Sequence, residues 1–87
     1  MVWKINIDKR VLKDMQKLGK KPCAEIIAFL DELVQQENPR SRGKSLRHEL
    51  KGLWRYRVGK YRIICEIQDK RLVVLAIAIG HRREVYK

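Results

Sequence analysis

Arginine side chains at alternating positions are the feature of this sequence best suited to chemistry. Arg55 and Arg57 are two residues apart in a segment that reads as a strand, so both lie on one face of it. Trp54 and Tyr56 fall on the opposite face, which is suited to packing in a core. The two arginines therefore face away from that core.

The residues that follow predict a hairpin that adds a third arginine. Gly59-Lys60 is typical of a two-residue turn of type II′, which has glycine at its first central position. The resulting strand pairs are Val58 with Tyr61, Arg57 with Arg62, Tyr56 with Ile63 and Arg55 with Ile64. Because paired residues share a face, we expect Arg55, Arg57 and Arg62 to form one cluster.

Like charges placed opposite each other destabilise a sheet, so a fold that keeps this cluster is expected to use it for a function. We interpret it as a site for an anion, and phosphate is the expected anion. The alternative is structural, with the arginines paired to Asp or Glu on other elements. Glu49 is the acidic residue close to them in sequence, which weakens that alternative.

The net charge of +11 is concentrated in the middle of the 87-residue chain. Residues 40–62 hold nine Lys/Arg and one acidic residue, whereas residues 1–39 hold seven against six and residues 63–87 five against three. Such a basic stripe is typical of nucleic-acid binders, and the alternative is a solvated surface. A membrane-surface role is disfavoured because these charges fall on a loop and strands rather than on an amphipathic helix.

A second group of candidate residues follows Gly80, where the last predicted strand ends. It consists of His81, Arg82, Arg83 and Tyr86. Side chains that leave the end of a strand are aimed by a rigid scaffold, although a frayed, solvated terminus is the alternative. A lone histidine such as His81 is more often structural than catalytic.

Length and composition predict one globular domain over residues 1–87. No segment reads as a leader or a membrane span, and Cys23 and Cys65 are expected to be buried thiols, as in the cytoplasm. These cysteines, His48 and His81 lack the spacing of a zinc site, so neither a metal nor another cofactor is expected.

The periodicity of apolar residues predicts an α+β domain. The expected elements are a strand over residues 2–7, a helix from the Asp8 cap to about Leu18, a second helix from Pro22 to Glu37-Asn38-Pro39, a basic loop over residues 39–44, the hairpin, and a strand over residues 71–79. Residues 72–79 are continuously apolar, as expected for a strand that is covered on both faces or is central in the sheet. The two helices should form a hairpin on one face of the sheet.

If the bound anion is an RNA phosphodiester, cleavage needs no metal. The ribose 2′-hydroxyl can attack the adjacent phosphate, while clustered arginines stabilise the charge that develops on the phosphorane. A proton acceptor and a proton donor are also needed. Arginine stays protonated and accepts protons poorly, so His81 or Tyr86 must move the proton unless charge and positioning dominate.

The chain resembles the RelE family of bacterial and archaeal toxins, within the RelE/ParE superfamily, over essentially its whole length. The residues that carry the resemblance are Leu50-Lys51-Gly52-Leu53-Trp54-Arg55-Tyr56-Arg57-Val58-Gly59, Tyr61-Arg62-Ile63-Ile64 and the closing Gly80-His81-Arg82-Arg83-Glu84-Val85-Tyr86. The resemblance implies a ribosome-dependent endoribonuclease that cuts messenger RNA in the ribosomal A site. It also implies a β-α-α-β-β-β fold with a three-strand antiparallel meander.

The resemblance also implies roles for individual residues. Arg55 and Arg57 match two strand positions that contact substrate and are lysines in well-known relatives, one of them the proposed base. Arg62 and Arg82 match arginines that stabilise the transition state, and Tyr86 matches a tyrosine that orients or stacks on a base. His81 is our hypothesis for a partial replacement of the missing lysine base. Because one residue follows Tyr86 in this sequence, we expect the C-terminal helix of some relatives to be missing.

The implied partners are a RelB-like antitoxin, the 70S ribosome with messenger in its A site, and operator DNA only through the antitoxin. We expect ribosome or RNA contacts from the remaining basic residues of the middle segment and the tail, which are Arg40, Arg42, Lys44, Arg47, Lys51, Lys60 and Arg83. No membrane partner is expected.

Two alternatives to the nuclease share the expected fold. One is a ParE-like inhibitor that binds DNA gyrase and performs no chemistry, since a fold alone does not determine function. The other is an inactive relative that titrates the antitoxin or binds ribosomes without cutting.

Overall fold

The helical hairpin follows from a cap and a glycine in the first part of the chain. The computed structural model describes residues 3–46 and 52–81. Helix α1 (Lys9–Lys17) begins after Asp8, whose carboxylate accepts a 2.8 Å hydrogen bond from the backbone N–H of Arg10. Gly19 has a φ of 102°, which favours glycine, and it joins α1 to α2 (Lys20–Leu33).

The described strands form one mixed sheet. They are β1 (Lys4–Ile7), β2 (Lys44–Ser45), β3 (Leu53–Val58), β4 (Tyr61–Gln68) and β5 (Val73–His81), in the order β1-β5-β4-β3-β2. Strands β3, β4 and β5 form the expected antiparallel meander, and β1 pairs with β5 in parallel. The apolar β5 is therefore central, as predicted.

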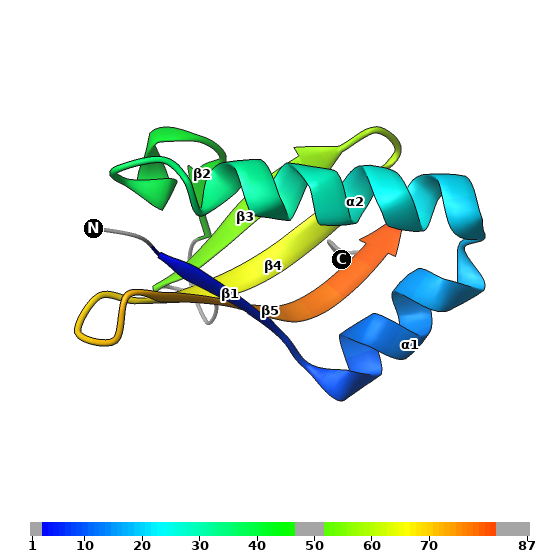
Figure 1. Ribbon diagram of the computed structural model, residues 1–87, viewed down its shortest axis with the longest axis horizontal. Coiled ribbons are helices and arrows are strands. Elements are labelled where there is room, and N and C mark those ends of the chain that lie inside the picture. Colours follow the sequence, from blue (N-terminus) through cyan, green and yellow to red (C-terminus); the bar gives the residue numbers. More distant parts are fainter. Residues whose placement is uncertain (1–2, 47–51, 82–87) are drawn as a thin grey trace.

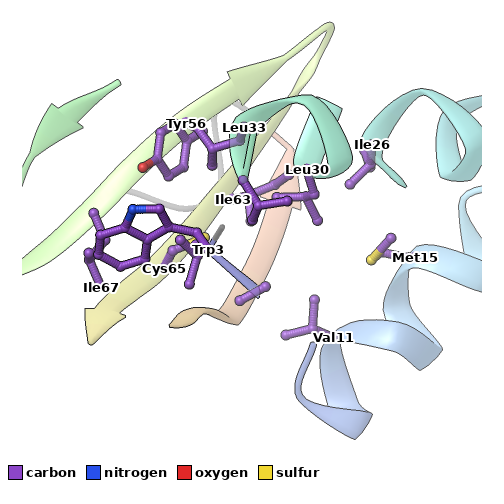
Figure 2. Close-up of a cluster of buried hydrophobic side chains, with 13 residues drawn as sticks. Trp3, Val11, Met15, Ile26, Leu30, Leu33, Tyr56, Ile63, Cys65 and Ile67 are labelled. Carbon is purple, nitrogen blue, oxygen red and sulfur yellow. The ribbon is translucent and has the colours of Figure 1, made fainter. Parts of the chain in front are cut away.

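Both helices cover the same face of the sheet, with α2 lying across the strands and α1 beside β5 (Figure 1). The core lies between these two layers, where Met15, Ile26 and Leu30 from the helices meet Tyr56, Ile63 and Cys65 from the strands (Figure 2). Tyr56 is completely buried, and its ring lies 5.7 Å from that of Phe29. The expected hairpin on one sheet face is confirmed, and none of the described helices is long and apolar enough to span a bilayer.

Aromatic donors fix the loop that follows α2. The indole of Trp3 donates to the carbonyl of Glu37, and the indole of Trp54 donates to that of Arg42. Between them the Tyr56 hydroxyl donates a 2.7 Å hydrogen bond to the Pro39 carbonyl, within the short 3₁₀ helix η1 (Pro39–Ser41). The core face of β3 therefore holds the basic loop in place.

Several boundaries differ from the sequence predictions. Helix α2 starts at Lys20 and ends at Leu33, before the expected stop at Glu37, and β2 was not predicted at all. Gly80 does not end the last strand, because β5 continues to His81 and Gly80 pairs with Arg62.

Candidate functional site

The hairpin between β3 and β4 has the predicted register. Arg57 pairs with Arg62, and Arg55 pairs with Ile64. Gly59 has a φ of 58°, and among the described non-glycine residues positive φ occurs at Leu72 alone. Lys60 therefore lacks the positive φ of a type I′ turn, which fits the predicted type II′ turn.

Cross-strand pairing arranges the basic residues in two rows on the face opposite the helices. The first row runs from Arg57 through Arg62 to Gly80. The next row starts at Lys44 and contains Arg55, Ile64 and Ala78. We call the surface formed by Lys44, Arg55, Arg57 and Arg62 the basic face.

The arginines of the basic face differ in burial. Arg57 is exposed, whereas Arg55 and Arg62 are half-buried and take part in interactions within the protein. The Nε atom of Arg62 is buried, and the neighbouring Ile64 is only 5% exposed. The basic face thus combines two half-buried arginines with one exposed arginine.

Gly80 shapes the end of the first row. It lies directly opposite Arg62 on β5 and has no side chain to cover the sheet there. A planar guanidinium beside a glycine, which adds no side chain of its own, is suited to a phosphate, which needs room as well as donors. The carboxylate of Glu66 also lies on this face, beyond Ile64, where it accepts a 2.7 Å hydrogen bond from Gln68.

Lys44 joins the basic face through the short strand β2. The preceding Gly43 has a φ of 76°, and a Cβ there would collide with the carbonyl oxygen of Arg55. Only glycine lets β2 approach β3 this closely. Lys44 is among the residues predicted to bind RNA, but its position beside Arg55 was not predicted, because a two-residue strand leaves no periodic signal in the sequence.

Two residues of the predicted RNA-binding set form ion pairs. Arg40 makes a bidentate contact with Asp69, at 2.7 and 2.8 Å, and Arg42 lies 3.0 Å from Glu32. The hydrogen bond from Arg40 lowers the pKa of Asp69, and the same contact raises the pKa of Arg40. Both arginines thus already have an anionic partner within the protein, and their role in RNA binding stays a prediction.

The remaining predicted site residues are placed only in part. Lys60 is exposed in the hairpin turn, and His81 lies opposite Tyr61 at the end of β5, with its side chain outside the description. The other candidates lie outside the described residues: Arg47, Lys51, Arg82, Arg83 and Tyr86.

The cysteines do not contribute a nucleophile to the basic face. Cys65 is buried in the core, and burial raises the pKa of its thiol to about 12. Cys23 is half-buried on α2. Within the described part of the chain, His, Cys, Asp and Glu side chains form no group of three that could hold a metal ion.

Comparison with known proteins identifies the family. The family model described as "ParE toxin of type II toxin-antitoxin system, parDE" matches residues 5–86. The mRNA interferase toxin RelE of Escherichia coli is 30% identical to this chain over 93 residues, covering 99% of the chain and 92% of that protein. This chain is a RelE-type toxin of the RelE/ParE family.

Further relatives support the assignment along the whole chain. The toxin RelG of Mycobacterium tuberculosis is 29% identical over 87 residues, covering 100% of this chain and 99% of that protein. The toxin–antitoxin complex RelBE2 of the same organism contains a chain that matches with a TM-score of 0.84 at 28% identity, covering 94% of this chain and all of that chain. An archaeal RelE–RelB complex from Pyrococcus horikoshii matches with a TM-score of 0.76 at 29% identity, covering 97% and 99%. The RelE-type fold predicted from the sequence is confirmed.

Proposed function

We propose that this toxin is a metal-independent endoribonuclease that cuts messenger RNA in the ribosomal A site. The observation that carries the proposal is the first row of the basic face, where Arg57, Arg62 and Gly80 are neighbours on three adjacent strands. Two guanidinium groups beside a glycine can bind a phosphodiester and the extra charge it gains during cleavage.

The proposed reaction is attack by the ribose 2′-oxygen on the adjacent phosphorus. A bond forms between the 2′-oxygen and phosphorus while the bond from phosphorus to the 5′-oxygen breaks, which leaves a 2′,3′-cyclic phosphate and a 5′-hydroxyl. Arg57 and Arg62 stabilise the phosphorane, with Arg55 and Arg82 adding positive charge. The proton lost by the 2′-hydroxyl goes to a base, for which His81 and Tyr86 are the candidates, and the 5′-oxygen gains a proton.

The ribosome supplies what the small basic face lacks. The described basic side chains are suited to binding the sugar–phosphate backbone, and they provide little sequence-specific contact with the bases. Binding to ribosomal RNA would hold the toxin through phosphate contacts, and the ribosome would present the messenger in a fixed geometry. We therefore expect weak cleavage of free RNA.

A RelB-like antitoxin is the proposed protein partner. Solved structures similar to this chain include toxin–antitoxin complexes named RelBE2 and RelE–RelB. We propose that a cognate antitoxin blocks the toxin in the cytoplasm and mediates any contact with operator DNA. Gyrase inhibition is the less favoured function, because relatives along the whole chain are named mRNA interferases.

The test is cleavage in a reconstituted translation reaction, with messenger 5′ ends mapped by primer extension. We expect cuts at A-site codons that require ribosomes, that persist in Arg71→Ala and that vanish in Arg82→Ala. Arg71 is an exposed arginine in the turn before β5 and serves as the matched control. Intact messenger despite arrested growth would overturn the proposal, and inhibition of gyrase supercoiling would then support the alternative.

A further inference from the structure

The helical layer carries opposite charge in its two parts. Residues 9–21, which span α1 and the start of α2, hold six basic residues and one acidic residue. Residues 22–39 hold four acidic residues and no basic one. The small net charge of residues 1–39 therefore hides a second basic region, which gathers at one end of the helical layer (Figure 1).

The lysines of α1 form a stripe that points away from the core. Lys9, Lys13 and Lys17 are spaced four residues apart and are all exposed. Val11 and Met15 are buried against the sheet on the opposite side of the same helix. The stripe thus lies on the outermost line of the helical layer.

Three further exposed cations extend this stripe, namely Arg10, Lys20 and Lys21. We call these six residues the helical basic surface. Across residues 3–46 and 52–81 the ion pairs involve Arg40 and Arg42, and none involves a member of this surface. The described part of the protein therefore provides no ion-pair partner for these six residues, and the surface keeps a net positive charge with Asp14 included.

Helix stability does not account for this charge. Lys9 and Arg10 lie in the first turn of α1, where the helix dipole disfavours positive charge. Lys9, Lys13 and Lys17 also repel one another at i,i+4 spacing, and Asp14 is the one acidic residue among them on α1. A polyanion that binds the surface would relieve this repulsion.

The spacing of the stripe suits a nucleic-acid backbone. Successive lysines are about 6 Å apart along the helix axis, so each can reach a separate phosphate. Lysine is a flexible point charge that neutralises phosphates without reading bases. The helical basic surface and the basic face lie on opposite sides of a domain that measures 32 × 29 × 21 Å.

We propose that the helical basic surface binds the phosphate backbone of structured RNA while the basic face holds the RNA that is cut. The inference rests on the proposed function, under which the structured RNA is ribosomal RNA. The toxin is then held from two sides, and the helix lysines affect binding without taking part in the chemistry.

The test uses Lys9→Glu/Lys13→Glu in the full chain, with Lys70→Glu/Arg71→Glu as the matched control. Both double variants reverse two exposed charges. Glutamate suits the first helical turn at position 9 and is a good helix former at position 13, so the fold should be kept. Co-sedimentation with purified ribosomes at about 50 and 200 mM salt measures affinity and its salt dependence. Cleavage at saturating toxin measures the chemical step separately.

We expect the helix variant to bind ribosomes at least about tenfold more weakly with a shallower salt dependence, and the control to change less than about twofold. Cleavage at saturation should be unchanged in both. Equal losses in the two variants, or unchanged binding in the helix variant, would overturn the inference. If the unaltered protein binds ribosomes through α1 but never cuts messenger, the proposed function fails while the RNA-binding surface stands.

Discussion

The two faces of the sheet are built from the same strands but carry opposite kinds of side chain. On the helix side, Tyr56, Ile63 and Cys65 are buried in the core. On the other side, Arg57 and Arg62 face each other across adjacent strands. Each of these core residues is next in sequence to a residue on the opposite face. A one-residue slip in register would therefore move the core side chains to the basic face and the arginines into the core.

This comparison separates stability from function. The helix side lowers the free energy of folding by removing apolar surface from water. The basic face raises that free energy, because it places like charges together. A charged cluster that destabilises the fold is expected to serve in binding. Substitutions on the helix side should therefore change the free energy of unfolding, and substitutions on the basic face should change RNA cleavage.

The largest effect on stability is expected from Leu30→Ala on the helix side. Leu30 is 1% exposed between α2 and the sheet. Removing it leaves a cavity and should lower the free energy of unfolding by about 2–5 kcal/mol, as measured by chemical denaturation. Cleavage per folded molecule should stay unchanged; a selective loss of cleavage would contradict the separation of the two faces.

On the basic face, Arg57→Ala should lower A-site cleavage by about 10²–10³-fold, the usual loss for one donor to a developing charge. Arg57 is exposed and paired with Arg62, so its removal should not lower the denaturation midpoint and should raise it slightly by relieving like-charge repulsion. Arg57→Lys keeps the charge without the two-pronged guanidinium and should recover part of the rate. Equal cleavage by Arg57→Ala and Arg71→Ala would remove Arg57 from the site.

A smaller effect is expected from Tyr56→Phe, because the ring stays and only the hydroxyl is lost. The Pro39 carbonyl then loses its 2.7 Å hydrogen bond. We expect a loss of about 1–3 kcal/mol in unfolding free energy, read from urea denaturation. A-site cleavage should not change, since the lost hydroxyl lies in the core and not on the basic face. A loss of cleavage comparable to that of Arg57→Ala would show that the loop positions the basic face.

The smallest effect is expected from Asp69→Asn, which breaks an exposed ion pair with Arg40. The folded-state pKa of Asp69 is lowered, so its stabilising contribution is present above its unfolded pKa and is lost as pH falls through the folded pKa. Denaturation midpoints of the variant and the unaltered protein should therefore nearly coincide at pH 7 and converge fully in acid. A difference that grows toward acid pH would contradict this sign.

The sequence predicted the local features of the site correctly. The alternation of residues 53–58 and the Gly59-Lys60 turn were enough to pair Arg57 with Arg62, because strand period and turn length set the register. The helix cap at Asp8 and the central position of β5 were also predicted correctly, because a capping residue and a continuous apolar segment are both visible in the local sequence. The proposed roles of Arg82 and Tyr86 stay predictions, as these residues lie outside the description.

The errors arose where distant segments meet. The position of Lys44 beside Arg55 depends on a two-residue strand and on the glycine before it. The ion pair between Arg40 and Asp69 joins residues that are 29 apart in sequence, and the local sequence around either residue does not predict this contact. Gly80 was taken as the end of a strand because glycine weakens strands locally, but pairing with β4 outweighs that preference.

The sequence by itself determined which residues share a face, where the chain turns and how much positive charge it carries. Those properties follow from backbone periodicity and local conformational preferences, which act over a few residues. Only the tertiary structure decided which cations are neutralised and which stay available. That outcome depends on distances between segments far apart in the chain, and the electrostatic energy of a pair depends on those distances and on burial.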